Sequence, residues 1–171
     1  MPATPSPRLD SVRGVTSTVR LVPMTREQYD AFRLTGEDEY AASIRDSGSL
    51  PEAEARERAA ADYARLLPAG MDSEGHCFWT AYDGDEAVGM LWLRFTDTSV
   101  GLTAFGFDFS VREDLRRRGY GRALLQAAEV ECRARGVVSV GLQVFGDNLA
   151  AQALYEQMGF EVTSIQMSRR L

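Results

Sequence analysis

The chain contains no lysine, and all 19 of its basic residues are arginines. A phosphate-binding loop of the Walker A type needs a lysine, so this class of nucleotide site is excluded. Any phosphate group would have to be bound by guanidinium groups or by main-chain N–H groups. Acidic residues outnumber the basic ones and give a formal net charge of -6. This acidity disfavours a general nucleic-acid-binding protein, which normally carries a basic face.

Cysteine and histidine are scarce. Cys77 and Cys132 are too isolated for a disulfide framework, so we expect two free thiols. His76 is the single histidine, and nothing beside it completes a set of metal ligands. We therefore expect no metal site and interpret His76 as a residue at the start of a strand. Cys132 falls on the apolar face of a predicted helix and is no candidate nucleophile.

Long apolar runs are also missing. None approaches the roughly 20 residues that a membrane-spanning helix needs, so we expect no membrane partner. Residues 1–17 are rich in Pro, Ser and Thr and lack the apolar segment of a secretory signal. We predict a flexible tail for residues 1–17, one domain over residues 18–171 and a cytoplasmic location.

Alternating apolar residues and capping signals predict a mixed α/β chain. The "DGDE" stretch at residues 83–86 is a strong hairpin signal. A helix between two strands normally makes those strands parallel. We therefore expect an α/β fold with a mixed, mostly antiparallel twisted sheet and helices on both faces. The expected elements are a strand at 18–24, helices from Thr25 and from Pro51 to Leu66, strands at 77–82, 87–95 and 103–111, a helix ending near Arg135, a strand at 137–144 buried on both faces, a helix capped by Asp147 or Asn148, and a last strand from Phe160.

Three arginines precede a Gly-x-Gly step in "RRRGYGRALL", Arg116–Leu125, where a helix is expected to begin. The first turn of a helix offers unpaired N–H groups and a partial positive charge, which together favour phosphate. Gly119 and Gly121 lack a Cβ and would let ligand oxygens approach the main chain. The alternative is an ordinary loop-to-helix junction with solvated arginines. A Rossmann turn does not fit, because Leu124 stands where a third glycine is needed.

Two motifs carry a resemblance to the GNAT N-acetyltransferases. "VREDLRRRGYGRALL" resembles their acyl-CoA-binding motif, Arg/Gln-x-x-Gly-x-Gly/Ala, with Arg116, Gly119 and Gly121 in the matching positions. "NLAAQALYEQMGF" resembles their second region, with Asn148 and Tyr155 in place. The two motifs stand in the family's order, separated by a helix and a strand, and the resemblance covers nearly all of the chain after the tail.

The resemblance implies a GNAT-like acyl-CoA-binding fold with acetyl-CoA as co-substrate. Strands 103–111 and 137–144 would be parallel but splayed, with the pantetheine arm between them and the pyrophosphate on the glycine turn. The arginines would face the phosphorylated nucleotide end of the coenzyme. Coenzyme-binding residues implied in this way are Phe109, Ser110, Val111, Arg116, Arg117, Arg118, Gly119, Tyr120, Gly121, Arg122, Asn148, Ala151 and Tyr155.

The implied reaction is direct attack of a primary amine on the thioester, without a covalent enzyme intermediate. The acceptor would be an unidentified small molecule or peptide. Tyr155 would be the general acid, although it also fits the apolar face of its helix. Asp108 stands within a strand, where a carboxylate is unusual. It could hold or deprotonate the amine or pair with an arginine, and Glu113 or water are alternative bases. Asn148 could bind pantetheine, cap its helix, or do both.

Other interpretations remain open at this point. The chain could be a non-catalytic acyl-CoA-binding or regulatory module, or an acyltransferase that uses a longer acyl-CoA. A homodimer is possible because dimers are common in the resembling family. The family's usual two-strand C-terminal arm would be a single long strand here.

Overall fold

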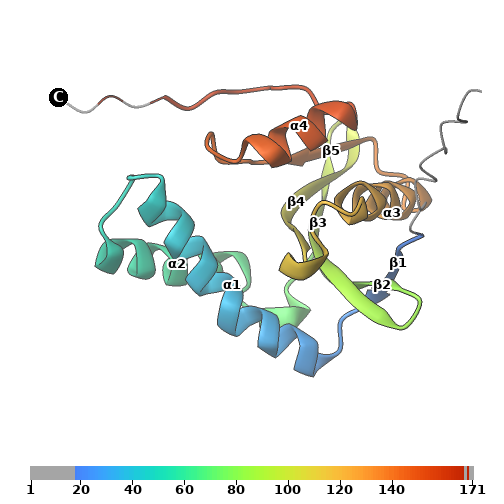
Figure 1. Cartoon of the computed structure of the whole chain (residues 1–171), viewed down its shortest axis with the longest axis horizontal. Coiled ribbons are helices and arrows are strands. Elements are labelled where there is room, and N and C mark those ends of the chain that lie inside the picture. Colours follow the sequence, from blue (N-terminus) through green and yellow to red (C-terminus); the bar gives the residue numbers. More distant parts are fainter. Residues whose placement is uncertain (1–17, 168, 170–171) are drawn as a thin grey trace, which may run out of the picture.

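The computed structural model describes residues 18–167 and residue 169 (Figure 1). The predicted tail, residues 1–17, lies outside these residues. In the described part no helix combines the length and the apolar character needed to cross a membrane. The elements are β1 (Arg20–Pro23), α1 (Arg26–Asp46), α2 (Glu52–Leu66), the 3-10 helix η1 (Gly70–Asp72), β2 (His76–Asp83), β3 (Glu86–Thr98), β4 (Gly101–Val111), the 3-10 helix η2 (Glu113–Leu115), α3 (Tyr120–Ala134), β5 (Ser139–Leu142) and α4 (Leu149–Gln157).

The strands form one sheet in the order β1-β2-β3-β4-β5. The first three pairings are antiparallel, and β4 pairs with β5 in parallel. Helices α1 and α2 cover one face and α3 covers the other (Figure 1). The predicted mixed α/β fold with helices on both faces is confirmed.

Each face of the sheet has its own core. On the α3 face, Leu91 and Leu93 of the sheet are fully buried and Leu124 of α3 is nearly so. Fully burying a leucine side chain contributes about 1.5–3 kcal/mol. On the opposite face, Phe78 and Trp92 pack with aromatic residues of α1 and α2. Aromatic residues of the β2–β3 hairpin therefore form part of the core on that face.

Helix α1 starts at the predicted capping box. The Thr25 hydroxyl accepts from the N–H of Gln28, and the Gln28 side chain accepts from the N–H of Thr25. The helix continues to Asp46. Gly36 lies inside it, where an added Cβ would stand 2.8 Å from the Tyr63 hydroxyl. The missing side chain therefore lets α1 and α2 approach closely.

The outer edge of the sheet differs from the prediction. Strand β5 covers Ser139–Leu142, shorter than 137–144, and it is not buried on both faces because Ser139 and Gly141 are exposed. Residues 160–167 form no strand, so the described chain supplies no neighbour outside β5. An apolar run normally indicates a central strand. Without a neighbour on its outer side, the strand formed by this run lies at the edge of the sheet.

Candidate active site

The parallel pairing between β4 and β5 stops halfway along β4. The last pair is Gly106 with Leu142, whereas β4 continues to Val111, paired only with β3. From Phe107 onward the outer edge of β4 therefore has no strand partner among the described residues. Such an edge offers main-chain groups to the amides of an extended ligand. The predicted splayed parallel pair is confirmed.

A β-bulge lies where this open edge begins. Trp92 pairs with Asp108, but the next residue of β3, Leu93, pairs with Gly106, so Phe107 is the extra residue. A bulge bends the strand and re-aims its side chains. Phe107 packs into the core beneath α1 and α2. The charge of Asp108 acts on Tyr63 of α2 from the same side.

Gly106 also allows a ring to cross the strand. A Cβ at this position would collide with the ring of Phe109, so the ring lies over the glycine. Phe109 in turn meets Tyr155 of α4 edge-on, with ring centroids 6.4 Å apart. The glycine and the two aromatic rings thus bring α4 to the open edge of β4.

The Asp108 carboxyl is half-buried. Burial raises its pKa, a hydrogen bond with Ser110 partly offsets this effect, and the charge of Glu39 on α1 adds to it, so that the resulting pKa is about 6. In the described part of the chain no arginine nitrogen lies within 4.0 Å of this carboxyl. The arginine pairing that the sequence left open is therefore not observed there.

Tyr155 of α4 is close enough to Asp108 for the charge of the carboxylate to act on its phenol. Its ring is half-buried against Phe109 and Phe160. Burial raises the pKa of its phenol, and the negative charge of Asp108 raises it further. The phenol therefore stays protonated at neutral pH. The packing role and the proton-donor role that the sequence allowed are compatible in this position.

The glycine turn is open in front of α3. Gly119 is the N-cap, with a left-handed φ of 92°, and an added Cβ would meet nothing within 4 Å. Arg117 also has a positive φ, 64°, and is the one non-glycine residue with that conformation among those described. Such backbone is costly for a side-chain-bearing residue and concentrates at functional sites.

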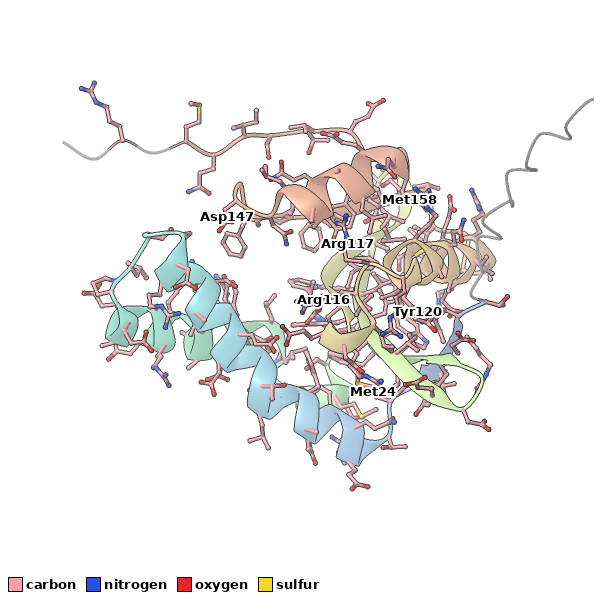
Figure 2. The ribbon with its side chains drawn as sticks, viewed as in Figure 1. Met24, Arg116, Arg117, Tyr120, Asp147 and Met158 are labelled. Carbon is pink, nitrogen blue, oxygen red and sulfur yellow. The ribbon has the colours of Figure 1, made fainter. Side chains whose placement is uncertain are left out.

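The arginines of the turn differ from their neighbour Arg112. Arg112 forms ion pairs with Glu86 and Asp114. By contrast, Arg116, Arg117 and Arg118 are exposed and form no ion pair within 4.0 Å in residues 18–167. Figure 2 labels the first two beside this turn. The Nε of Arg116 donates to the Val111 carbonyl at 3.3 Å. Its remaining N–H groups and the guanidinium groups of Arg117 and Arg118 are thus left for an anion at the start of α3.

The other side chains of the turn have structural partners. The Tyr120 hydroxyl donates to Asp83 at 2.8 Å. A Cβ on Gly121 would lie 3.0 Å from the Leu154 Cδ2 atom, so this glycine lets α4 approach α3. Arg122 donates to the Gln157 side chain at 2.6 Å. The side chains of Tyr120 and Arg122 and the close packing at Gly121 connect α3 to β2 and α4, which leaves the main chain of these residues for the role expected from the sequence.

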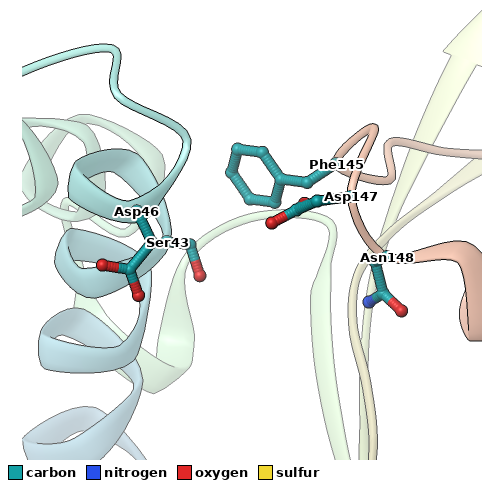
Figure 3. A pocket seen from close by; sticks show the side chains of 5 residues that line it. All are labelled: Ser43, Asp46, Phe145, Asp147 and Asn148. Atoms are coloured by element: carbon teal, nitrogen blue, oxygen red, sulfur yellow. The ribbon is translucent and has the colours of Figure 1, made fainter.

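Asn148 caps α4, because its side-chain oxygen accepts from the N–H of Ala151 at 3.1 Å. The choice between Asp147 and Asn148 is thereby decided. Asn148 also lines a cavity of about 300 Å³ between α1 and the loop before α4 (Figure 3). Sequence reasoning missed this cavity, because Ser43 and Asp46 of α1 belong to no motif. Its other lining residues are Phe145 and Asp147.

The remaining candidates have ordinary surroundings. Glu113 is exposed in η2, and its carbonyl accepts from the N–H of Arg116. Cys77 and Cys132 are free thiols, and Cys132 is buried as expected. Among the described residues no group of three His, Cys, Asp or Glu side chains could hold a metal ion.

Comparisons with known proteins identify the family. Residues 37–160 match the profile of the Acetyltransferase (GNAT) family. The chain is 34% identical to the N-acetyltransferase YdgE of Bacillus subtilis over 88% of this chain and 97% of that protein. It is 31% identical to YycN of the same organism, over 90% and 99% of the two chains. The crystal structure of YycN superposes with a TM-score of 0.86, at 29% identity over 90% of this chain and 99% of that chain.

A more distant relative has a named acceptor. The [ribosomal protein bS18]-alanine N-acetyltransferase of Escherichia coli is 34% identical over 58% of this chain and 78% of its own length. The open edge of β4, the glycine turn and the matches to YdgE and YycN agree. The chain therefore belongs to the GNAT acetyltransferase family and is an acyl-CoA-dependent N-acyltransferase.

Proposed function

We propose that the protein transfers the acetyl group of acetyl-CoA to a primary amine by direct attack, with no covalent enzyme intermediate. One observation carries this proposal. The open edge of β4 has the carboxyl of Asp108 on it and the phenol of Tyr155 beside it, and the charge of the first acts on the second. A proton acceptor and a proton donor therefore flank the place where an extended thioester would lie.

The residues around the turn fit the coenzyme. The main-chain N–H groups at the start of α3 and the guanidinium groups of Arg116, Arg117 and Arg118 would bind its phosphates. Phe109, Ser110 and Val111 would hold the pantetheine amides along the open edge of β4, and the α4 cap residues Asn148 and Ala151 would line the other side. When bound, the coenzyme supplies the acyl thioester.

Asp108 and Tyr155 would handle the protons. A carboxylate with a pKa near 6 is a stronger base than an ordinary aspartate and is still mostly ionised at neutral pH. It would accept a proton from the amine as the nitrogen bonds to the acyl carbon. Tyr155 would donate a proton to the departing sulfur as the carbon–sulfur bond breaks. Neutralising Asp108 also removes the charge that raises the phenol pKa, so the first transfer favours the second.

The acceptor would approach from the α1 side. The cavity between α1 and the loop before α4 has the carboxylates of Asp46 and Asp147 in its wall, which suits a positively charged small molecule or peptide. A peptide amine is supported by the relative that is named for the alanine of ribosomal protein bS18.

The two free thiols, Cys77 and Cys132, fit the cytoplasmic location that we also propose.

The functional unit would be residues 18–171 as one domain, associated as a homodimer. Within the described residues, β5 is an unpaired sheet edge. An apolar segment is also exposed, with Val162, Ile165 and Met167 each at least 71% exposed. Two copies could cover both features reciprocally. Sedimentation velocity at micromolar concentration should give a dimer, and a monomer would refute this part of the proposal.

The activity is tested by release of free thiol from acetyl-CoA with a panel of amines. The panel should contain a peptide with an N-terminal alanine, peptides with other N-termini, and diamines. We expect amine-dependent thiol release whose kcat/KM rises as the pH passes through about 6, where Asp108 ionises. Propionyl-CoA and succinyl-CoA should compete poorly. Thiol release that no amine stimulates would overturn the proposal.

A further inference from the structure

A hydrogen bond in the aromatic core beneath α1 and α2 connects His76 to the site. The indole N–H of Trp92 donates to Nδ1 of His76 at 2.9 Å, and the two residues are 2% and 8% exposed. Because Nδ1 accepts this bond, it carries no proton and His76 is neutral. Burial, with a contribution from Arg94, lowers the pKa of His76 to about 4. The histidine is therefore a constant acceptor at neutral pH.

Trp92 lies opposite the bulge of β4. It is paired with Asp108, and Phe107 is the extra residue at the next step. The indole stacks on the Phe107 ring with centroids 4.6 Å apart and an interplanar angle of 22°. Phe78 stacks on it as well, with centroids 5.3 Å apart. A residue held between two rings and by a hydrogen bond has one orientation, and Phe107 must fit against it.

We infer that His76 and Trp92 are positioning residues for the Asp108 carboxyl. His76 fixes the plane of the indole, and the indole fixes the bulge that aims the carboxyl between the α1–α2 pair and α4. The inference rests on the proposed function, in which Asp108 accepts the proton of the amine. Neither positioning residue contacts the coenzyme or the acceptor in this account.

The surroundings of Asp108 make its orientation measurable. Glu39 of α1 and Ser110 of β4 act on its pKa. The phenols of Tyr63 on α2 and Tyr155 on α4 have pKa values raised in part by its charge. A loosened bulge would let water reach the carboxyl and would lower its pKa toward the value of an ordinary aspartate.

Trp79 offers a matched control. It is also nearly buried, at 4% exposed. It packs in the core on the α3 face, edge-on to Phe95 with centroids 6.4 Å apart. Trp79→Phe and Trp92→Phe remove the same atoms from a buried site, but only the second change touches the bulge. A difference between the two variants in the pKa of Asp108 therefore measures the positioning of the carboxyl rather than the loss of core packing.

The experiment is a pH titration of the Asp108 carboxyl followed by ¹³C NMR, with the resonance assigned by its absence in Asp108→Asn. It needs no acceptor. We expect the midpoint near 6 in the wild type to fall by about one pH unit in His76→Leu and Trp92→Phe. It should stay in place in Trp79→Phe and in His76→Gln, whose amide oxygen can accept the indole N–H. If His76→Leu does not fold because the indole N–H is left buried, Trp92→Phe alone carries the test. Unchanged midpoints in the folded variants would overturn the inference.

Thiol release from acetyl-CoA, with the most active amine of the panel, separates this inference from the proposed function. His76→Leu and Trp92→Phe should lower kcat about tenfold with the KM for acetyl-CoA unchanged. In the double variant kcat should fall no further than in Trp92→Phe alone, because both residues act through one hydrogen bond. If Asp108→Asn keeps the wild-type kcat, the proposed role of Asp108 fails. If Asp108→Asn is inactive while His76→Leu and Trp92→Phe keep the wild-type kcat and the wild-type midpoint of the Asp108 titration, only the positioning inference fails.

Discussion

The ring of Tyr155 lies edge-on to that of Phe109, with centroids 6.4 Å apart and an interplanar angle of 68°. This contact brings α4 to the unpaired edge of β4. Tyr155→Phe keeps the ring contact and removes only the hydroxyl. We expect coenzyme A to bind as before while kcat for thiol release falls about a hundredfold, because the proton donor is lost. Calorimetric titration and the thiol assay measure the two effects.

Tyr120→Phe is the matched control for this change. It also removes one phenol hydroxyl, here the donor to Asp83, and should lower the free energy of unfolding by about 1 kcal/mol. Turnover should remain at the wild-type level, because Tyr120 connects α3 to β2. Equal losses of kcat in the two variants would remove Tyr155 from the chemistry.

Asp108 and His76 affect stability in opposite directions as the pH changes. Folding raises the pKa of Asp108 to about 6, so its stabilising contribution is present at low pH and is lost as the pH rises through that value. Folding lowers the pKa of His76 to about 4, so its contribution is present above about 6.5 and is lost as the pH falls. In the wild type the two slopes partly cancel.

Asp108→Asn should therefore expose the slope of His76 alone. We expect the free energy of unfolding of this variant to rise more steeply with pH, between about 4 and 6.5, than that of the wild type. Urea unfolding at a series of pH values measures both slopes. A flatter profile in the variant would contradict the pKa shift assigned to Asp108.

Gly121 of α3 packs closely against Leu154 of α4, since an added Cβ would lie 3.0 Å from Leu154 Cδ2. Gly121→Leu should lower the free energy of unfolding by about 1–3 kcal/mol through overpacking. Adding Leu154→Ala should restore part of this loss, and the coupling is measured by a double-mutant cycle. Strictly additive effects would show that the two residues do not meet.

Local signals were sufficient to predict much of the fold. Capping signals predicted the start of α1, and the "DGDE" turn predicted the hairpin of β2 and β3. The sequence predicted β5 wrongly, because an apolar run indicates a strand but does not say whether a neighbour covers it. The effect of the β4 bulge on Asp108 depends on Trp92, a partner on another strand, which local signals do not reveal.

The site was predicted less completely for the same reason. The residue pattern pointed to Asp108 and to the glycine turn, and the resemblance supplied the role of Tyr155. It could not tell that Gly121 serves the packing of α4 while Gly119 faces open space. Nor could it supply the cavity wall on α1, because Ser43 and Asp46 are brought there by tertiary packing. Motifs identify residues that act locally, whereas long-range contacts require the folded chain.

The central claim is that the open turn before α3 binds the diphosphate of the coenzyme, and Gly119→Glu tests it most directly. Gly136→Glu is its control, because Gly136 also has a positive φ, 75°, and open space where a Cβ would stand, but lies at the other end of α3. Both variants should lose similar stability from backbone strain, about 1–2 kcal/mol.

Calorimetric titration with coenzyme A then separates the two variants. We predict that Gly119→Glu weakens binding at least about a hundredfold, which is about 2.7 kcal/mol, while Gly136→Glu binds as the wild type does. Equal coenzyme affinity in a folded Gly119→Glu variant would contradict the account.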